Sequence, residues 1–176
     1  MKKINLAISG CMGRMGQQLI KSSKNNKDFN LKTLTEYINI NKRINGIKPE
    51  LNSEGAFKKT DIIIDFTIPK CTLEVLKIAS KLKKKVVIGT TGFSRSQEGQ
   101  IKKYSKKIPI LKAGNMSLGI NLLMYITEMA SKSLGNSFLS KVFEKHKKGT
   151  MLKSGHSLLI IKCLPKSSRI LGCNLF

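Results

Sequence analysis

Three glycines spaced three residues apart, Gly10, Gly13 and Gly16, stand where a short apolar run gives way to a helical pattern. A tight turn at such a junction exposes backbone N–H groups at a helix N-terminus, which can hold the phosphates of a dinucleotide. The spacing differs from the usual G-x-G-x-x-G because Cys11 and Met12 occupy the turn. The pattern predicts pyrophosphate binding, and an ordinary strand-to-helix turn is the alternative.

An acidic residue, Glu36, follows Gly16 by 20 residues and ends a second strand-like segment. In dinucleotide-binding folds, an acidic side chain at this point accepts hydrogen bonds from the ribose hydroxyls. Taken alone, Glu36 would be read as a surface carboxylate. The glycine turn upstream makes ribose binding the favoured interpretation.

Three further polar loops follow apolar, strand-like runs, at residues 65–69 (DFTIP), 89–92 (GTTG) and 113–117 (AGNMS). Open α/β sheets place their ligand loops at the carboxyl ends of the strands. Each of these loops alone could be ordinary turn chemistry. Four loops at the same edge predict a ligand site there, with the last loop closing over the nicotinamide end.

The elements that must position these loops alternate between strands and helices. We predict strands at 4–9, 31–37, 61–66, 86–88 and 108–111 and helices at 13–23, 71–82 and 97–104. The continuous apolar run from Ile62 to Ile64 is typical of a parallel strand buried on both faces. The segment 39–55 is predicted to be a polar stretch. This alternation favours an α/β fold with an open, mostly parallel sheet.

The pattern changes in the second half of the chain. A long apolar-periodic segment predicts a helix over 117–134 that ends near Gly135, and a strand candidate follows at 138–143. Beyond Glu144 the sequence is polar and punctuated by glycine, and no acidic residue occurs again. We expect a dinucleotide-binding domain at 1–120 and a partial second domain at 121–176.

The composition excludes several classes of protein. A hydrophobic fraction of 40% without a long apolar run argues against disorder and against a membrane-spanning chain. The N-terminal residues 1–4 (MKKI) lead directly into a strand without the pattern of a secretory signal, so we expect a cytoplasmic location. The four cysteines form no CxxC pair, so we expect free thiols and no metal site.

The net charge of +23 would attract nucleic acid or an anionic membrane. However, 29 of the 33 basic residues are lysine, whereas base reading and bidentate phosphate recognition favour arginine. The lysines are scattered, and tryptophan is absent. We therefore favour a generic solvated basic surface and expect neither a nucleic-acid nor a membrane partner.

In order and spacing, these motifs resemble those of the dihydrodipicolinate reductase family. The resemblance is carried by residues 13–16 (GRMG), 64–67 (IDFT), 88–93 (IGTTGF) and 115–121 (NMSLGIN), and it covers residues 1 to about 145. It implies a Rossmann-type open parallel sheet followed by an α/β substrate and tetramerisation domain. It also implies a homo-oligomer that acts on a small-molecule dicarboxylate.

The reaction implied is hydride transfer from NADPH or NADH to 4-hydroxy-tetrahydrodipicolinate. The product is tetrahydrodipicolinate, in the diaminopimelate route of lysine biosynthesis. Family members often carry Arg or Lys at the position of Tyr37 to meet the 2'-phosphate of NADP, so NADH stays as plausible here as NADPH. The cofactor-binding residues that the resemblance implies are Gly10, Cys11, Met12, Gly13, Arg14, Met15, Glu36, Tyr37, Gly89, Thr90, Thr91, Ala113, Gly114, Asn115 and Met116.

The substrate segment of the family has the signature E-x-H-H-x-x-K-x-D-x-P-S-G-T, which residues 144–157 follow only in part. Two registers are possible, differing by one residue, and neither restores the Asp or the Pro. The resemblance implies His146 as the catalytic acid/base, with Lys148 substituting for the family's proton-donating lysine. The substrate-binding residues it implies are Lys147, Ser154, Gly155 and His156.

Family members continue beyond the point that corresponds to residue 176, so we expect an incomplete α/β substrate/oligomerisation domain. Two other functions remain open on the sequence alone. One is a catalytically impaired, truncated remnant that only binds nucleotide. The other, suggested by the net charge, is a basic nucleic-acid-associated protein.

Overall fold

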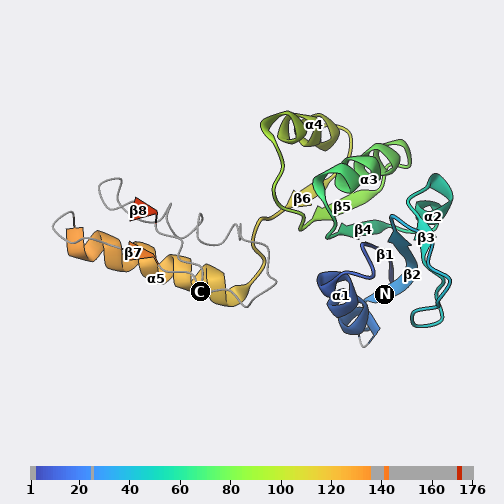
Figure 1. The fold of residues 1–176 in the computed structure, drawn as a ribbon, viewed down its shortest axis with the longest axis horizontal. Coiled ribbons are helices and arrows are strands. Elements are labelled where there is room, and N and C mark those ends of the chain that lie inside the picture. The colour runs from blue at the N-terminus through green and yellow to red at the C-terminus, as the bar shows by residue number, and fades with distance from the viewer. Residues whose placement is uncertain (1–2, 25, 136–140, 143–169, 172–176) are drawn as a thin grey trace. The chain divides into compact units, whose positions relative to one another are not determined.

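The computed structural model of the chain describes residues 3–24 and 26–135, together with the backbone of 141–142 and 170–171. The chain divides into two compact units, Met1–Ala113 and Gly114–Phe176. The first unit contains a parallel sheet with its helices, and the second contains a long helix (Figure 1).

Six parallel strands form the sheet of the first unit, in the order β3-β2-β1-β4-β5-β6 (Figure 1). The strands are β1 (Ile4–Ser9), β2 (Phe29–Glu36), β3 (Glu50–Leu51), β4 (Ile62–Asp65), β5 (Lys85–Ile88) and β6 (Ile110–Lys112). This is the strand order of the Rossmann fold, and it reverses between β1 and β4. Ligands of such sheets bind at that reversal, outside the carboxyl ends of the strands.

Helices on both faces of the sheet bury the apolar side chains that alternate along the strands. They are α1 (Arg14–Lys24), α2 (Glu54–Lys58), α3 (Pro69–Lys81) and α4 (Arg95–Ser105). On one face, Leu6 and Ile8 of β1 pack with Ile20 of α1. On the other face, Ala7 belongs to a larger core that includes Val75 of α3. Burial on both faces explains why the strands read as nearly continuous apolar runs.

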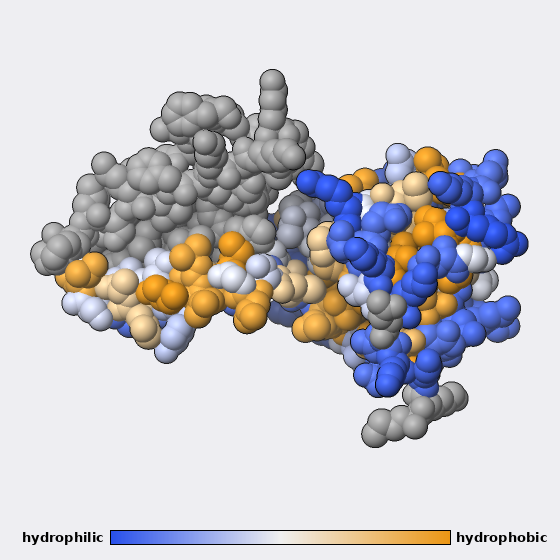
Figure 2. Space-filling view, turned by 90° about the horizontal axis from the view of Figure 1, so that it is seen from below, coloured by the Kyte–Doolittle hydropathy of each residue, from blue (hydrophilic) through white to orange (hydrophobic). Residues whose placement is uncertain are grey.

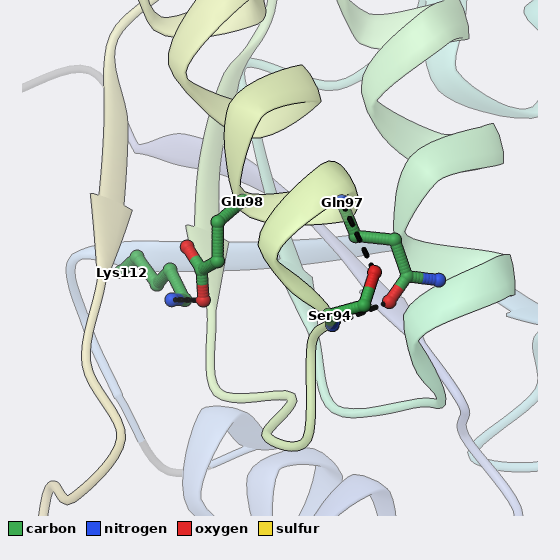
Figure 3. Close-up of polar contacts among 4 residues, drawn as sticks. All are labelled: Ser94, Gln97, Glu98 and Lys112. Carbon is green, nitrogen blue, oxygen red and sulfur yellow. Dashed lines mark hydrogen bonds and ion pairs between the residues drawn. The ribbon is translucent and has the colours of Figure 1, made fainter.

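Helix α4 begins with a capping box (Figure 3). The Oγ of Ser94 accepts the N–H of Gln97 at 3.3 Å, and the N–H of Ser94 donates to Oε1 of Gln97 at 2.8 Å. In the same first turn of the helix, Glu98 forms an ion pair with Lys112 of β6. The same ammonium lies 5.1 Å from the ring centroid of Phe93. These contacts join the start of α4 to the end of the edge strand β6.

Most predicted elements of the first unit are confirmed, with ends that differ by one to a few residues. The prediction of a polar stretch over 39–55 is wrong at its end, where β3 and the first residues of α2 lie. Both elements are too short to show a period. The start of α2 is fixed by Ser53, whose side chain accepts the N–H of Ala56 at 3.1 Å.

The second unit contains α5 (Leu118–Leu134) and two short parallel strands, β7 (Lys141–Val142) and β8 (Ile170–Leu171). The predicted helix over 117–134 is confirmed, with Ser117 as its N-cap. Large apolar side chains are exposed along α5, as the orange surface in Figure 2 shows; the most exposed is Leu118, at 84%. Among the helices of the described residues, none is both long and apolar enough to cross a membrane.

Phe57 on α2 tests how much this short, unpredicted helix contributes to the core, because its side chain is fully buried. Replacing Phe57 with alanine removes a large buried ring, so we expect Phe57→Ala to lower the free energy of unfolding by about 3–5 kcal/mol. Urea denaturation would measure this. The control Leu51→Ala alters a side chain on β3 that is 44% exposed. A comparable loss in both variants would contradict this account of the core.

Candidate functional site

The glycine turn lies directly after β1 and is fastened to β2. The N–H groups of Gly10 and Cys11 both donate to the carbonyl oxygen of Thr35, at 3.0 and 3.2 Å. Gly10 has a φ of 78°, a conformation that glycine adopts without steric cost. The N–H of Gly13 donates back to the carbonyl of Gly10 at 3.1 Å. The predicted tight turn is therefore present between β1 and α1.

Gly16 allows α1 to begin against this turn. A Cβ at Gly16 would lie 2.1 Å from the carbonyl oxygen of Gly10 and 2.9 Å from the Cα of Cys11. The side-chain amide of Gln17 also donates, through Nε2, to the carbonyl of Cys11 at 2.6 Å. The first N–H groups of a helix have no acceptor within the helix, so the start of α1 can present donors to an anion. Any side chain at Gly16 would force the helix away from the turn.

Glu36, at the end of β2, faces the glycine turn. Its Oε2 accepts the N–H of Met12 at 3.0 Å, and its Oε1 accepts the N–H of Tyr37 at 3.1 Å. The residue is only 8% exposed. Each carboxylate oxygen has accepting capacity for a second donor. Glu36 is therefore held in place by backbone donors and can still accept hydroxyl groups such as those of a ribose.

A pocket of about 500 Å³ lies beside the turn and Glu36. It brings together five of the residues predicted for cofactor binding: Gly10, Met12, Gly13, Glu36 and Tyr37. The other lining residues are Ser9, Ile38, Ile40, Asn52, Phe66, Thr67, Ile68 and Cys71. Among the residues that line this pocket there is no lysine or arginine. The pocket is therefore mostly apolar, with one acidic side chain at the turn.

The remaining predicted residues at the turn do not line this pocket. Cys11 is fully buried, whereas Arg14 and Met15 are exposed at the start of α1. Burial, with the nearby Glu36 as the second cause, raises the pKa of the Cys11 thiol to about 11. Burial also raises the pKa of Cys71. The Cys11 side chain is therefore an apolar packing group at neutral pH.

The loops after β4 and β5 meet at a close contact between Gly89 and Phe66. A Cβ at Gly89 would lie 2.1 Å from a ring carbon of Phe66, so the ring occupies the space that a side chain would need. Of the other predicted residues in the second loop, Thr90 is buried and Thr91 is exposed. The absence of a side chain at Gly89 therefore lets Phe66 reach the pocket.

Asp65, at the end of β4, is fully buried and accepts three hydroxyl groups. Thr67 donates to its Oδ1 at 2.8 Å, while Thr72 and Thr90 donate to its Oδ2 at 2.5 and 3.0 Å. Burial raises the pKa of the Asp65 carboxyl, and the hydrogen bonds from the three threonines oppose this effect. Asp65 thus connects β4 with α3 and with the loop after β5.

The residues predicted after β6 belong to both units. Ala113 closes the first unit, and its N–H donates to the carbonyl of Ile88 at 3.1 Å. Gly114, Asn115 and Met116 belong to the second unit. There, Oδ1 of Asn115 accepts the N–H of Ser117 at 2.9 Å, just before α5. The predicted catalytic and substrate-binding residues His146, Lys147, Lys148, Ser154, Gly155 and His156 lie outside the described residues.

Several residues of the site are not predicted from the sequence. Gly16 was recognised as part of the turn but not as the glycine with the tightest contact. Ile38, Ile40 and Asn52 of the pocket come from the segment that was predicted as a polar stretch. The apolar residues of that segment, such as Ile40, are the sequence feature that could have indicated a pocket wall. Asp65 belongs to the predicted loop 65–69, but its full burial and its bonds to three threonine hydroxyls are not evident from the sequence.

Gly16 gives a sharp test of the turn. We expect Gly16→Ala to lower the free energy of unfolding by about 1–3 kcal/mol, because the added methyl group overlaps the backbone of Gly10. Thermal and urea unfolding would measure the change. Gly99→Ala is the matched control, since Gly99 is also helical and has open space around it. If Gly16→Ala were as stable as Gly99→Ala, the close contact would be refuted.

Asp65 predicts a particular dependence of stability on pH. Because its pKa is raised in the folded chain, the native state binds this proton more tightly than the unfolded state does. Its contribution to stability therefore increases as the pH falls through the raised pKa toward the unfolded value of about 3.9. We expect the free energy of unfolding of the unsubstituted chain, minus that of Asp65→Asn, to rise over this range. A difference that fell would contradict the raised pKa.

Comparison with known proteins gives consistent matches. The family model "Dihydrodipicolinate reductase, N-terminus" matches residues 4–116. The 4-hydroxy-tetrahydrodipicolinate reductase of Pelagibacter ubique (strain HTCC1062) is 68% identical over 165 residues, covering 90% of this chain and 64% of the relative. That of Buchnera aphidicola subsp. Acyrthosiphon pisum (strain Tuc7) is 38% identical over 177 residues, covering 94% of this chain and 66% of the relative.

A solved structure is also similar in fold. The dipicolinate-bound dihydrodipicolinate reductase from Paenisporosarcina sp. TG-14 superposes with a TM-score of 0.74 at 23% identity, covering 95% of this chain and 67% of that one. The chain thus spans about two thirds of the length of these relatives. With the matched family model and the high identity to curated relatives, the chain belongs to the dihydrodipicolinate reductase family.

Proposed function

We propose that this chain acts as a 4-hydroxy-tetrahydrodipicolinate reductase, transferring a hydride from a reduced nicotinamide nucleotide to 4-hydroxy-tetrahydrodipicolinate. The observation that carries the proposal is the contact between the N–H of Met12 and the carboxylate of Glu36 at 3.0 Å. It joins the glycine turn to an acidic residue at the reversal point of the sheet, beside a pocket. Membership of the family supports the same activity.

The residues of the site fit such a nucleotide. Gly10 and Gly16 let the turn pack closely against its neighbours, and the start of α1 supplies N–H donors for a pyrophosphate. Glu36 would accept the adenosine ribose hydroxyls, and Tyr37, Ile38 and Ile68 offer an apolar wall for the base. The bound nucleotide itself supplies the hydride. The chain's part is to bind it and fix its orientation.

The residues proposed to bind the substrate and transfer protons are assigned from the sequence. Residues 89–91 and 113–116 would line the nicotinamide and lead to the substrate. His146 would act as acid/base, with Lys148 donating a proton, and residues 147 and 154–156 would bind the substrate's carboxylates. The chain is also proposed to form a homo-oligomer and to be located in the cytoplasm.

We propose NADH over NADPH as the coenzyme, and the lining of the pocket supports this preference. The 2'-phosphate of NADPH would add negative charge at the ribose, next to the buried carboxylate of Glu36. Such a phosphate is usually met by a basic side chain, and the pocket lining includes none. Tyr37, which is 72% exposed, stands at the position where a basic side chain would pair with the 2'-phosphate.

The activity is tested by following oxidation of NADH with the purified chain, with the substrate generated in place from aspartate semialdehyde and pyruvate. We expect turnover above the rate without protein. His146→Ala should abolish it while NADH binding is kept, since His146 is not among the proposed coenzyme residues. Failure of the chain to bind either nucleotide would contradict the proposal. Binding without turnover would indicate a remnant that only binds nucleotide.

The coenzyme preference gives a separate prediction. NADH should bind at least about tenfold more tightly than NADPH, since an unpaired phosphate beside a carboxylate costs more than about 1.4 kcal/mol. Tyr37→Arg should narrow or reverse this ratio by supplying a cation, while Tyr37→Phe is the control that should leave it unchanged. Fluorescence titration with both nucleotides measures the ratio. Equal affinities in the unsubstituted chain would refute the preference.

A further inference from the structure

Thr90 lies in the loop after β5, and both hydrogen-bonding functions of its hydroxyl are engaged. Its Oγ1 donates to Oδ2 of Asp65 at 3.0 Å and accepts the N–H of Thr67 at 3.0 Å. The residue is only 3% exposed. A hydroxyl with one fixed acceptor and one fixed donor has a single orientation. Through Thr90, the loop after β5 is tied to the loop after β4.

Thr67 carries this connection to the glycine turn. Its side chain donates to Oδ1 of Asp65, so both its backbone and its side chain belong to the same network. Its Cγ2 would lie 2.8 Å from a Cβ placed on Gly10, which means that Thr67 packs directly on the turn. Thr67 also lines the pocket. A shift of Thr67 would therefore move the wall of the pocket against the turn.

Thr72 offers an internal comparison. Its hydroxyl donates to the same oxygen of Asp65 as that of Thr90, and it is fully buried. However, Thr72 is on α3 and does not line the pocket. Removing either hydroxyl deletes one hydrogen bond to Asp65. Only removal of the Thr90 hydroxyl also leaves the N–H of Thr67 without its acceptor.

We propose that Thr90 is a positioning residue for coenzyme binding: its hydroxyl, oriented by Asp65, holds Thr67 against the glycine turn. This inference rests on the proposed function. The hydroxyl of Thr90 is engaged inward with Asp65 and Thr67, so its side chain supports the coenzyme site indirectly, whereas the backbone of residues 89–91 can still line the nicotinamide as proposed. Thr90 acts through the loop after β4.

The experiment compares Thr90→Val, Thr90→Ser and Thr72→Val in the 176-residue chain, by NADH titration and by thermal unfolding. Both valine variants should be destabilised, since each loses one buried hydroxyl bonded to Asp65, and Thr90→Val should be destabilised more because it also leaves the N–H of Thr67 without its acceptor. Thr90→Val should weaken NADH binding about fivefold or more, the equivalent of one hydrogen bond. Thr90→Ser should restore affinity to within about twofold, and Thr72→Val should leave it unchanged.

Two results would overturn the proposal. One is Thr90→Val binding NADH as tightly as the unsubstituted chain, and the other is Thr72→Val losing as much affinity as Thr90→Val. Thr90→Ala, which removes the same hydroxyl without adding a methyl group in its place, replaces Thr90→Val if that variant does not fold. If no variant binds NADH, including the unsubstituted chain, it is the proposed function that fails.

A readout without coenzyme separates these cases. Hydrogen exchange at the backbone N–H of Thr67 reports directly on its bond to Thr90. Exchange should be at least about fivefold faster in Thr90→Val than in the unsubstituted chain and unchanged in Thr72→Val. Equal exchange rates in the two valine variants would overturn the proposal whatever the chain binds.

Discussion

Helix α1 begins so close to the end of β1 that a methyl group on Gly16 would lie 2.1 Å from the carbonyl oxygen of Gly10. This contact sets the direction of the helix and, with it, the direction of the free N–H groups at its start. The same turn is fastened to β2 through the carbonyl of Thr35 and presents the N–H of Met12 to Glu36. Because no side chain at Gly16 separates α1 from the turn, β1, α1 and the carboxylate of Glu36 lie together in one site.

Two buried acidic residues, Glu36 and Asp65, lie at the carboxyl edge of the sheet and have different roles: Glu36 borders the pocket, and Asp65 connects loops. Glu36 is held by backbone N–H groups and borders the pocket, so its oxygens can accept a ligand's hydroxyls. Asp65 is surrounded by threonine hydroxyls, and burial raises its pKa. The first is suited to contact a nucleotide, and the second holds together the loops that surround it. Although the chain carries a net charge of +23, no lysine or arginine lines this pocket.

Much of the first unit could be predicted because its strands are buried on both faces, and such runs are easily recognised. The glycine turn and Glu36 were found from spacing, and the structure places both beside one pocket. β3 and α2 were missed because elements of two and five residues carry no periodic signal. The engagement of Thr90 with Asp65 and Thr67 depends on contacts between residues up to 25 positions apart, which no local pattern encodes.

The proposed function requires a nicotinamide nucleotide to bind at the carboxyl edge of this sheet, between the glycine turn and Glu36. Mapping the backbone amide NMR signals of the chain during titration with NADH tests it most directly. We expect the largest changes at Met12, Gly13 and Tyr37, which line the pocket. Changes concentrated at Lys3, Ser23 and Asn30, which line a separate pocket of about 410 Å³, would contradict it, as would no change at all.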